Sequence, residues 1–324
     1  MSNRFNNRRL LIILGGLLML LLVTVIVKIP KEKSTLKDRI VDLDTADVYS
    51  IKISPKSSGG KSFEFVRENI KWSIKQESIV AVPRTDAVRN IFSEILSVKP
   101  QRLVSVDKTK WKEFELTDSL ATRISFFSKR GKKLADLMIG KFTYKQVSNP
   151  YSYGGNDIEG TSFVRLPDNK EIYAVDGFLA FSLGGNFNDW RDRSFLKCNK
   201  NDITRITFTF PSDSSYILQK KDSLWKAGEF TADSLNTVNY LNSIGFIEGE
   251  DFQDGFQPVG SPLYTMTIEG NNLLNISVKC YPETGKDKYI FNSSMNPEIY
   301  FFGNKNGMFD KLFKSSGYFT KKGR

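Results

Sequence analysis

The chain contains no histidine, and this absence limits the chemistry that its side chains can perform. A Ser-His-Asp triad, a Cys-His pair and a histidine metal site all need an imidazole, whose ordinary pKa lies near neutral pH. The sequence therefore excludes these classes of site. Any nucleophile or general acid has to come from Ser, Lys, Asp or Glu.

One hydroxyl and amine pair has a catalytic spacing, because Ser194 precedes Lys197 by three residues. On a helix this S-x-x-K pattern places the two groups one turn apart, but the S-D-N and K-T-G elements of the penicillin-recognising enzymes are missing. The segment 57–62 resembles the end of a phosphate-binding loop, yet Pro55 stands where its first glycine belongs and a strand-like run follows. We interpret the first as a chance match and the second as a hairpin turn.

Four acidic residues lie close together in an otherwise basic chain: Glu248, Glu250, Asp251 and Asp254. The cluster lacks the spacing of a calcium-binding loop, so we interpret it as a solvated loop. A pair of glycosidase carboxylates remains open, because their separation is a three-dimensional property. We predict no catalytic residue, no cofactor and no metal site, with a histidine-free envelope hydrolase using Ser194, Lys197, Glu250 or Asp251 as the alternative.

Charged and aromatic residues alternate between positions 186 and 196, and the centre of this segment is Trp190, Arg191, Asp192 and Arg193. We interpret it as a junction in which Asp189 and Asp192 pair with Arg191 and Arg193 while the aromatic rings pack. The alternative is a binding site. These four residues are the candidate site of the chain.

Residues 10–27 form an uncharged, strongly apolar run that as a helix spans roughly 27 Å, close to the thickness of the bilayer hydrocarbon. No A-x-A-like cleavage site and no cysteine for lipidation follow the run, which favours an uncleaved anchor over a signal peptide. Basic residues flank both sides. We expect the short N-terminus to stay inside and the body to lie outside the cytoplasm.

Lys and Arg number 47 against 36 Asp and Glu, a net charge of +11, but much of the excess lies near the two chain ends. A basic face on the body is therefore not required, and we expect no nucleic-acid partner. The two cysteines, Cys198 and Cys280, could form one bridge, which the sequence does not decide. Two buried thiols are the interpretation that we favour.

Hydrophobic periodicity predicts the same order of elements twice in the body. In the first copy, strands near 48–53 and 69–74 precede a helix from Pro83 whose buried face carries Val88, Ile91, Phe92, Ile95 and Leu96, and strands follow at 122–127, 134–139, 162–166 and 172–175. In the second, strands at 202–208, 216–220 and 222–226 precede a helix with Leu235, Val238, Leu241 and Ile244 on one face, and four more strands follow. Trp72 and Trp225 occupy corresponding places and are expected in the core.

The predicted fold is α+β, with an N-terminal transmembrane helix followed by two tandem repeats of a mostly antiparallel sheet packed on one helix. The predicted divisions are a cytoplasmic tail at 1–9, the anchor at 10–27, a linker at 28–44, repeats at 45–200 and 201–312, and a basic tail at 313–324.

Several short motifs, in order, resemble the bacterial domain-of-unknown-function family 4340. They are Trp72-Ser73-Ile74, Pro83-Arg84-Thr85-Asp86, Leu137-Met138-Ile139-Gly140-Lys141, Phe163-Val164-Arg165, Ile172-Tyr173-Ala174-Val175 and Trp190-Arg191-Asp192-Arg193-Ser194-Phe195-Leu196. The resemblance covers roughly residues 45–310. It implies an envelope protein linked to auxiliary parts of ABC-type transport systems of the gliding-motility kind, and it supplies no catalytic residues.

Taken together, these observations predict a single-pass protein of the bacterial inner membrane with a periplasmic body. We expect it to act as a non-catalytic binding or assembly module, an accessory of an ABC-type transport system. Its expected partners are membrane lipid, through residues 10–27, and a transporter or envelope protein complex. A binder of anionic lipid or polysaccharide is a further alternative.

Overall fold

The computed structural model describes residues 14–17, 19 and 39–320, apart from 57, 58, 60, 150, 152–155, 213, 284 and 286. The predicted tail at 1–9 lies outside these residues, as does the predicted anchor except for the helical positions 14–17 and 19. Among the residues that are described, no helix is long and apolar enough to cross a membrane.

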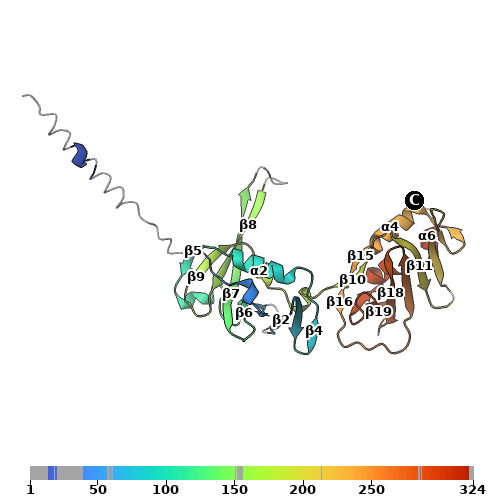
Figure 1. Cartoon of the computed structure of the whole chain (residues 1–324), viewed down its shortest axis with the longest axis horizontal. Helices are drawn as coiled ribbons and strands as arrows, with labels where there is room; N and C mark the ends of the chain where they lie inside the picture. The colour runs from blue at the N-terminus through green and yellow to red at the C-terminus, as the bar shows by residue number, and fades with distance from the viewer. Residues whose placement is uncertain are drawn as a thin grey trace, which may run out of the picture. The chain divides into compact units, whose positions relative to one another are not determined.

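Two large sheets make up most of the described chain, so the sheet-rich α+β class is confirmed (Figure 1). The strands of the first are β1 (Ser50–Ser54), β2 (Phe63–Glu68), β3 (Lys71–Gln76), β4 (Ile79–Ala81), β5 (Pro100–Ser105), β6 (Thr122–Phe127), β7 (Lys133–Ser148), β8 (Asn156–Arg165) and β9 (Ile172–Asp176). Their order across the mostly antiparallel sheet is β4-β3-β2-β1-β6-β7-β8-β9-β5.

The second sheet repeats this order with later strands, β14-β13-β12-β11-β17-β18-β19-β20-β16. These are β11 (Ile203–Thr209), β12 (Tyr216–Lys221), β13 (Leu224–Ala227), β14 (Phe230–Thr231), β16 (Asp251–Phe252), β17 (Tyr264–Gly270), β18 (Leu273–Pro282), β19 (Lys288–Ser293) and β20 (Tyr300–Asn304). One long helix follows the fourth strand in each case, α2 (Ala87–Ser97) and α4 (Ser234–Ile244). This matched order is what the predicted duplication requires.

A third sheet has two strands in the described chain, β10 (Ser194–Lys197) paired antiparallel with β15 (Phe246–Glu248). The sequence predictions omitted both of these strands and also the edge strands β4, β5, β14 and β16. These strands are short or exposed, so neither a long apolar run nor a clean alternation marks them.

Packing divides the chain into two compact units. One comprises Met1–Val48, Ser54–Lys56 and Ile91–Gly184, and the other comprises Tyr49–Ile53, Ser57–Asn90 and Gly185–Arg324. Strands of the first sheet therefore occur in both units, whereas the second sheet belongs wholly to the latter.

A tight turn with positive φ angles precedes each of the two tryptophan segments. Asn69, between β2 and β3, has a φ of 59°, and Asp222 and Ser223, between β12 and β13, have φ values of 48° and 70°. Asn and Asp tolerate this left-handed conformation, which suits two-residue hairpins. The following Trp72 and Trp225 are only half-buried, and Trp225 lies at the margin of the second core.

The two helices differ in how well the sequence predicted their buried faces. On α2, Val88, Ile91 and Ile95 are buried as expected. On α4, Leu235 and Val238 are 59% and 49% exposed, so this part of the prediction is wrong. The buried face instead carries Thr237, Tyr240, Leu241 and Ile244, which have the same i, i+3, i+4, i+7 spacing.

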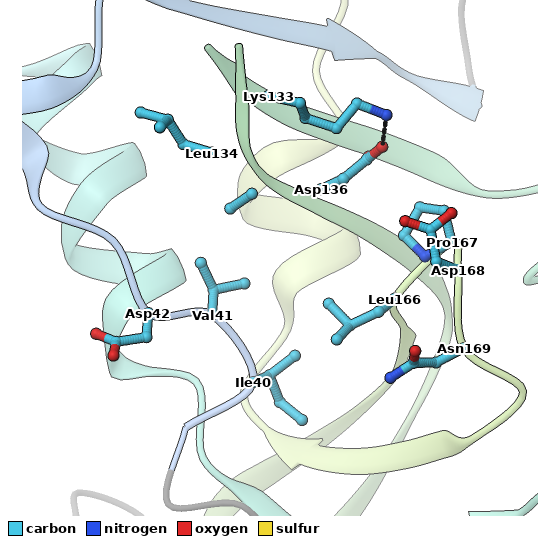
Figure 2. A pocket seen from close by; sticks show the side chains of 11 residues that line it. Ile40, Val41, Asp42, Lys133, Leu134, Asp136, Leu166, Pro167, Asp168 and Asn169 are labelled. Carbon is cyan, nitrogen blue, oxygen red and sulfur yellow. Dashed lines mark hydrogen bonds and ion pairs between the residues drawn. The ribbon is translucent and has the colours of Figure 1, made fainter. Parts of the chain in front are cut away.

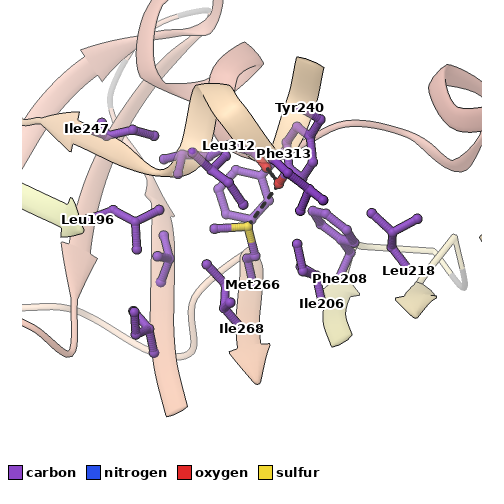
Figure 3. Packing of buried hydrophobic residues seen from close by; sticks show 14 of the residues in the cluster. Leu196, Ile206, Phe208, Leu218, Tyr240, Ile247, Met266, Ile268, Leu312 and Phe313 are labelled. Atoms are coloured by element: carbon purple, nitrogen blue, oxygen red, sulfur yellow. Dashed lines mark hydrogen bonds between the residues drawn. The ribbon is translucent and has the colours of Figure 1, made fainter. Parts of the chain in front are cut away.

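Tyr240 is 1% exposed within the hydrophobic core of the second sheet, although it carries a polar group (Figure 3). Its hydroxyl donates a hydrogen bond to the carbonyl oxygen of Leu312 at 2.7 Å and lies 3.2 Å from Sδ of Met266. Burial raises the pKa of Tyr240 well above its ordinary value, so the phenol stays neutral. The same core includes Phe319 of α6 (Ser316–Thr320), which is fully buried, so the folded body continues past residue 312.

The substitution Tyr240→Phe is expected to lower the free energy of unfolding by about 1–2 kcal/mol, because the buried Leu312 carbonyl loses its side-chain donor. Chemical denaturation measures the change. Tyr144→Phe is the matched control, since Tyr144 is 70% exposed, and its effect should be within about 0.5 kcal/mol. Equal losses in the two variants would contradict the role assigned to the Tyr240 hydroxyl.

Candidate functional site

The candidate segment follows a short capped turn. Asn186 begins the 3-10 helix η4 (Phe187–Asp189), and its side chain accepts a hydrogen bond from the backbone N–H of Asn188 at 2.9 Å. The carboxylate of Asp189 accepts from the backbone N–H of Asn186 at 2.8 Å in return. This reciprocal capping box fixes the direction in which the chain enters Trp190.

Trp190 is a packing residue, with only 2% of its surface exposed. Its indole N–H donates to the carbonyl oxygen of Gly185 at 3.3 Å, and the ring of Phe65 meets it edge-on at 5.7 Å. The guanidinium of Arg84 lies 4.9 Å from the ring centre, and the backbone N–H of Arg84 donates to the Trp190 carbonyl oxygen at 2.8 Å. No face of the indole is left for a large ligand to stack on.

Arg191 is 4% exposed and forms the strongest polar contact of the segment. Its two terminal nitrogens each donate to a different oxygen of Asp254 at 2.7 Å, and Nη1 also donates to the side-chain oxygen of Asn188 at 3.0 Å. The guanidinium plane lies 3.7 Å from the ring centre of Phe252. A planar fork that pairs with a carboxylate and stacks on an aromatic ring is a role that lysine cannot reproduce.

The predicted pairing within the segment is wrong. Asp189 caps the turn, Asp192 accepts from the backbone N–H of Ser194 at 2.9 Å, and Arg193 donates to the carbonyl oxygen of Gly249 at 3.1 Å. Arg191 takes a carboxylate 63 residues further along the chain, a partner that local spacing does not reveal.

The predicted acidic cluster also separates in the structure. Asp254 neutralises Arg191, while Glu250 accepts a hydrogen bond from the backbone N–H of Met308 at 3.1 Å and lies against Gly307. Glu248 and Asp251 are exposed. Across the described residues, no group of three or more Asp, Glu, Cys or His side chains is placed to hold a metal ion.

The other nucleophile candidates are placed as follows. Ser194 and Lys197 lie on strand β10, so they lack the one-turn helical spacing that the S-x-x-K pattern needs. Cys198 and Cys280 are both free thiols, and burial raises the pKa of each. The turn predicted at 57–62 lies partly outside the described residues, and β2 begins at Phe63.

A pocket of about 310 Å³ lies beside the start of β7 (Figure 2). Its lining mixes apolar and charged side chains, and comprises Ile40, Val41, Asp42, Lys133, Leu134, Ala135, Asp136, Leu166, Pro167, Asp168 and Asn169. None of these residues was singled out from the sequence. The available signal was Asp136 itself, a carboxylate inside an apolar strand, which needs partners from the neighbouring strand.

Asp136 receives those partners from β6 and from its own strand. Arg123 donates to both carboxylate oxygens at 2.9 and 2.6 Å, Lys133 donates at 2.7 Å, and the Ser125 hydroxyl donates at 3.0 Å. Burial raises the pKa of the Asp136 carboxyl, but these hydrogen bonds outweigh burial and hold the pKa below its ordinary value. The carboxylate is therefore a fixed anion in the pocket wall.

Arg165, which is 3% exposed, holds the turn at residues 166–169 that also lines the pocket. Its guanidinium donates to the carbonyl oxygens of Pro167 at 2.8 Å and Leu116 at 3.1 Å, and stacks on Trp111 with a centroid distance of 3.7 Å. These contacts fix the turn that follows β8. The motif arginine is thus a structural residue in the first repeat, as Arg191 is in the candidate segment.

The sequence model of a family described as a domain of unknown function (DUF4340) matches residues 72–255. The chain belongs to this family. The matched region begins in β3 and includes Trp190 to Arg193 together with Asp254, so the ion pair of Arg191 lies wholly inside the DUF4340 region. No curated protein and no solved structure matches the chain.

The substitution Asp254→Asn is expected to lower the free energy of unfolding by about 2–4 kcal/mol, because it leaves the buried Arg191 charge without its counterion. Asp251→Asn is the matched control in the same acidic cluster, with an expected change within about 0.5 kcal/mol. Denaturant titration of both variants measures the difference. Equal stability of the two variants would contradict the structural role of the Arg191 pair.

Acidification provides a test of the Asp136 network. A carboxylate whose pKa is lowered by folding stabilises the protein above its unfolded pKa of about 3.9, and this contribution disappears as the pH falls through the folded pKa. Asp136→Asn should therefore lower stability at neutral pH and flatten the decline in stability below about pH 4. Denaturation midpoints measured from pH 7 downward check this. Parallel pH profiles in the two proteins would contradict it.

Proposed function

We propose that this chain is a single-pass protein of the bacterial inner membrane whose periplasmic body is a non-catalytic assembly module, an accessory of an ABC-type transport system. The membrane location rests on the uncharged run at 10–27, which as a helix is long enough to span the hydrocarbon core of a bilayer. Membership of the DUF4340 family is compatible with this role and assigns no chemistry to the chain.

The observation that carries the assembly role is that α4 is apolar on two faces. Tyr240, Leu241 and Ile244 fill the core beneath the helix, while Leu235 and Val238 lie one turn apart on its outer side and are exposed. A surface helix normally turns polar residues outward, and apolar side chains at i and i+3 are the pattern by which one helix docks in a groove of a partner.

The candidate segment supports the same role. Arg191 and Arg193 bind Asp254 and Gly249 further along the chain. Asp189 and Asp192 accept hydrogen bonds from backbone N–H groups within the segment. Groups engaged in this way stabilise a scaffold and are not presented to a substrate. This arrangement favours a structural use of the distinctive Trp-Arg-Asp-Arg motif.

Recovery of the tagged full chain from its own membranes in mild detergent tests the proposal. Subunits of an ABC-type transporter should copurify in near-equal amounts, identified by mass spectrometry. The double variant Leu235→Ser, Val238→Ser should lose them, because the docking surface becomes polar. Asn239→Ser, an exposed polar change on the same helix, should retain them.

Two results would overturn the proposal. One is recovery of the protein without transporter subunits, which would favour binding of polysaccharide or anionic lipid. The other is turnover of an envelope substrate that a single point change abolishes. Circular dichroism of the two variants verifies that lost copurification does not reflect unfolding.

A further inference from the structure

The first sheet carries a two-stranded arm formed by the outer halves of β7 and β8 (Figure 1). Strand β6 pairs with β7 only as far as Ile139, and β9 pairs with β8 only from Thr161 onward. Residues 144–148 and 156–160 therefore pair only with each other beyond the body of the sheet, and Phe142 lies at the base of this arm. A two-stranded hairpin alone is marginally stable in water, so one face of such an arm is expected to be covered.

The two faces of the arm differ in chemistry. Phe142 and Tyr144 point to the same side as Ile158, because Tyr144 is paired with Gly160 and alternate residues share a face. These three side chains are 42%, 70% and 60% exposed, and the exposed Gln146, which is paired with Ile158, lies on the same face. The opposite face carries Thr143, an ion pair between Lys145 and Glu159 at 2.8 Å, and the pair of Val147 and Asp157.

The apolar face is fixed firmly at the base of the arm. The ring of Phe178 meets Phe142 edge-on at 5.5 Å and lies over Gly160, where a Cβ atom would come within 2.6 Å of it. The buried Ser162 hydroxyl donates to the carbonyl oxygen of Gly177 at 2.7 Å and accepts from the N–H of Leu179 at 2.9 Å. These contacts join β8 to helix α3 (Leu179–Leu183), so the arm leaves the sheet in a defined direction.

The arm projects from the same end of the sheet as the one at which the N-terminal chain enters. Pro100 pairs with Val175, Val175 with Ser162, and Ser162 with Phe142, so one row of paired residues links the start of β5 to the base of the arm. Ile40 donates its backbone N–H to the carbonyl oxygen of Val98, just before this row. The arm extends past the row on this same side.

The length of the preceding chain limits how far this end can lie from the bilayer. Eleven residues, 28–38, separate the run at 10–27 from Arg39, and they span at most about 40 Å. The arm is about seven residues long, roughly 24 Å. An arm of this length at the tethered end of the sheet can reach a membrane surface.

We propose that Phe142, Tyr144 and Ile158 insert into the interfacial region of the bilayer that holds residues 10–27. This inference rests on the anchor of the proposed function. Phenylalanine and tyrosine suit this depth, since their rings are apolar and the tyrosine hydroxyl reaches water. The other face carries Lys145 against Glu159 and Asp157, so no excess of positive charge draws the arm to anionic lipid, and the contact depends little on lipid charge and salt.

The test uses the full chain reconstituted in nanodiscs of zwitterionic phosphatidylcholine. Single Tyr144→Cys and Ile158→Cys variants carry an environment-sensitive fluorophore, and lipids bearing a nitroxide near the headgroup act as quenchers. Thr143→Cys is the matched control, because it lies next to Tyr144 on the opposite face of the same strand. The chain with only its native Cys198 and Cys280 gives the labelling background.

We expect lipid nitroxides to quench the fluorophore at 144 and 158 and to leave the fluorophore at 143 unchanged, with the same result in low and high salt. Absence of quenching at 144 and 158 overturns the insertion, including the case in which a blue-shifted emission shows that protein covers the face. Alkaline carbonate extraction of the native membranes is measured separately. A chain that resists extraction but is not quenched retains the proposed anchor, and a released chain overturns both proposals.

Discussion

An antiparallel sheet of nine strands has an apolar face much wider than a helix of eleven residues, and the rest of this fold depends on how that face is covered. In the second repeat, α4 contributes Tyr240 and Ile244, and the C-terminal segment adds Phe313 and Phe319. Aromatic side chains do most of this work because each buries a large area. Residues 313–320 are thus part of the fold.

Covering the sheets in this way buries polar groups, and each of the buried charges has a specific arrangement of partners. Arg191 has a bidentate carboxylate, Asp136 has three donors, and Arg165 has a set of backbone carbonyl oxygens. An unpaired charge at any of these positions would destabilise the protein by several kcal/mol. The motif residues Arg165 and Arg191 therefore stabilise the fold. The proposed functions depend on other surfaces.

Those surfaces carry exposed apolar side chains that are not part of the cores of the two sheets. The outer side of α4 and one face of the β7–β8 arm are the clearest examples. They differ in the contacts that we propose for them, because a helix face with i and i+3 side chains fits a protein groove whereas an aromatic hairpin near a tether fits a lipid interface.

The sheet-rich class, the family and the order of most elements could be predicted from the amino-acid sequence, because alternation of two and periodicity of 3.6 are local properties of the chain. The sequence predicted β6 at its observed bounds and the buried face of α2. The short edge strands escaped it. Three features became visible only in the folded chain: Asp254 pairs with Arg191, Tyr240 is buried where Val238 was expected, and β7 and β8 extend as an arm. These features depend on contacts between segments that are distant in the sequence. A buried polar group pairs with whichever partner the fold brings near it, and local spacing does not reveal that partner.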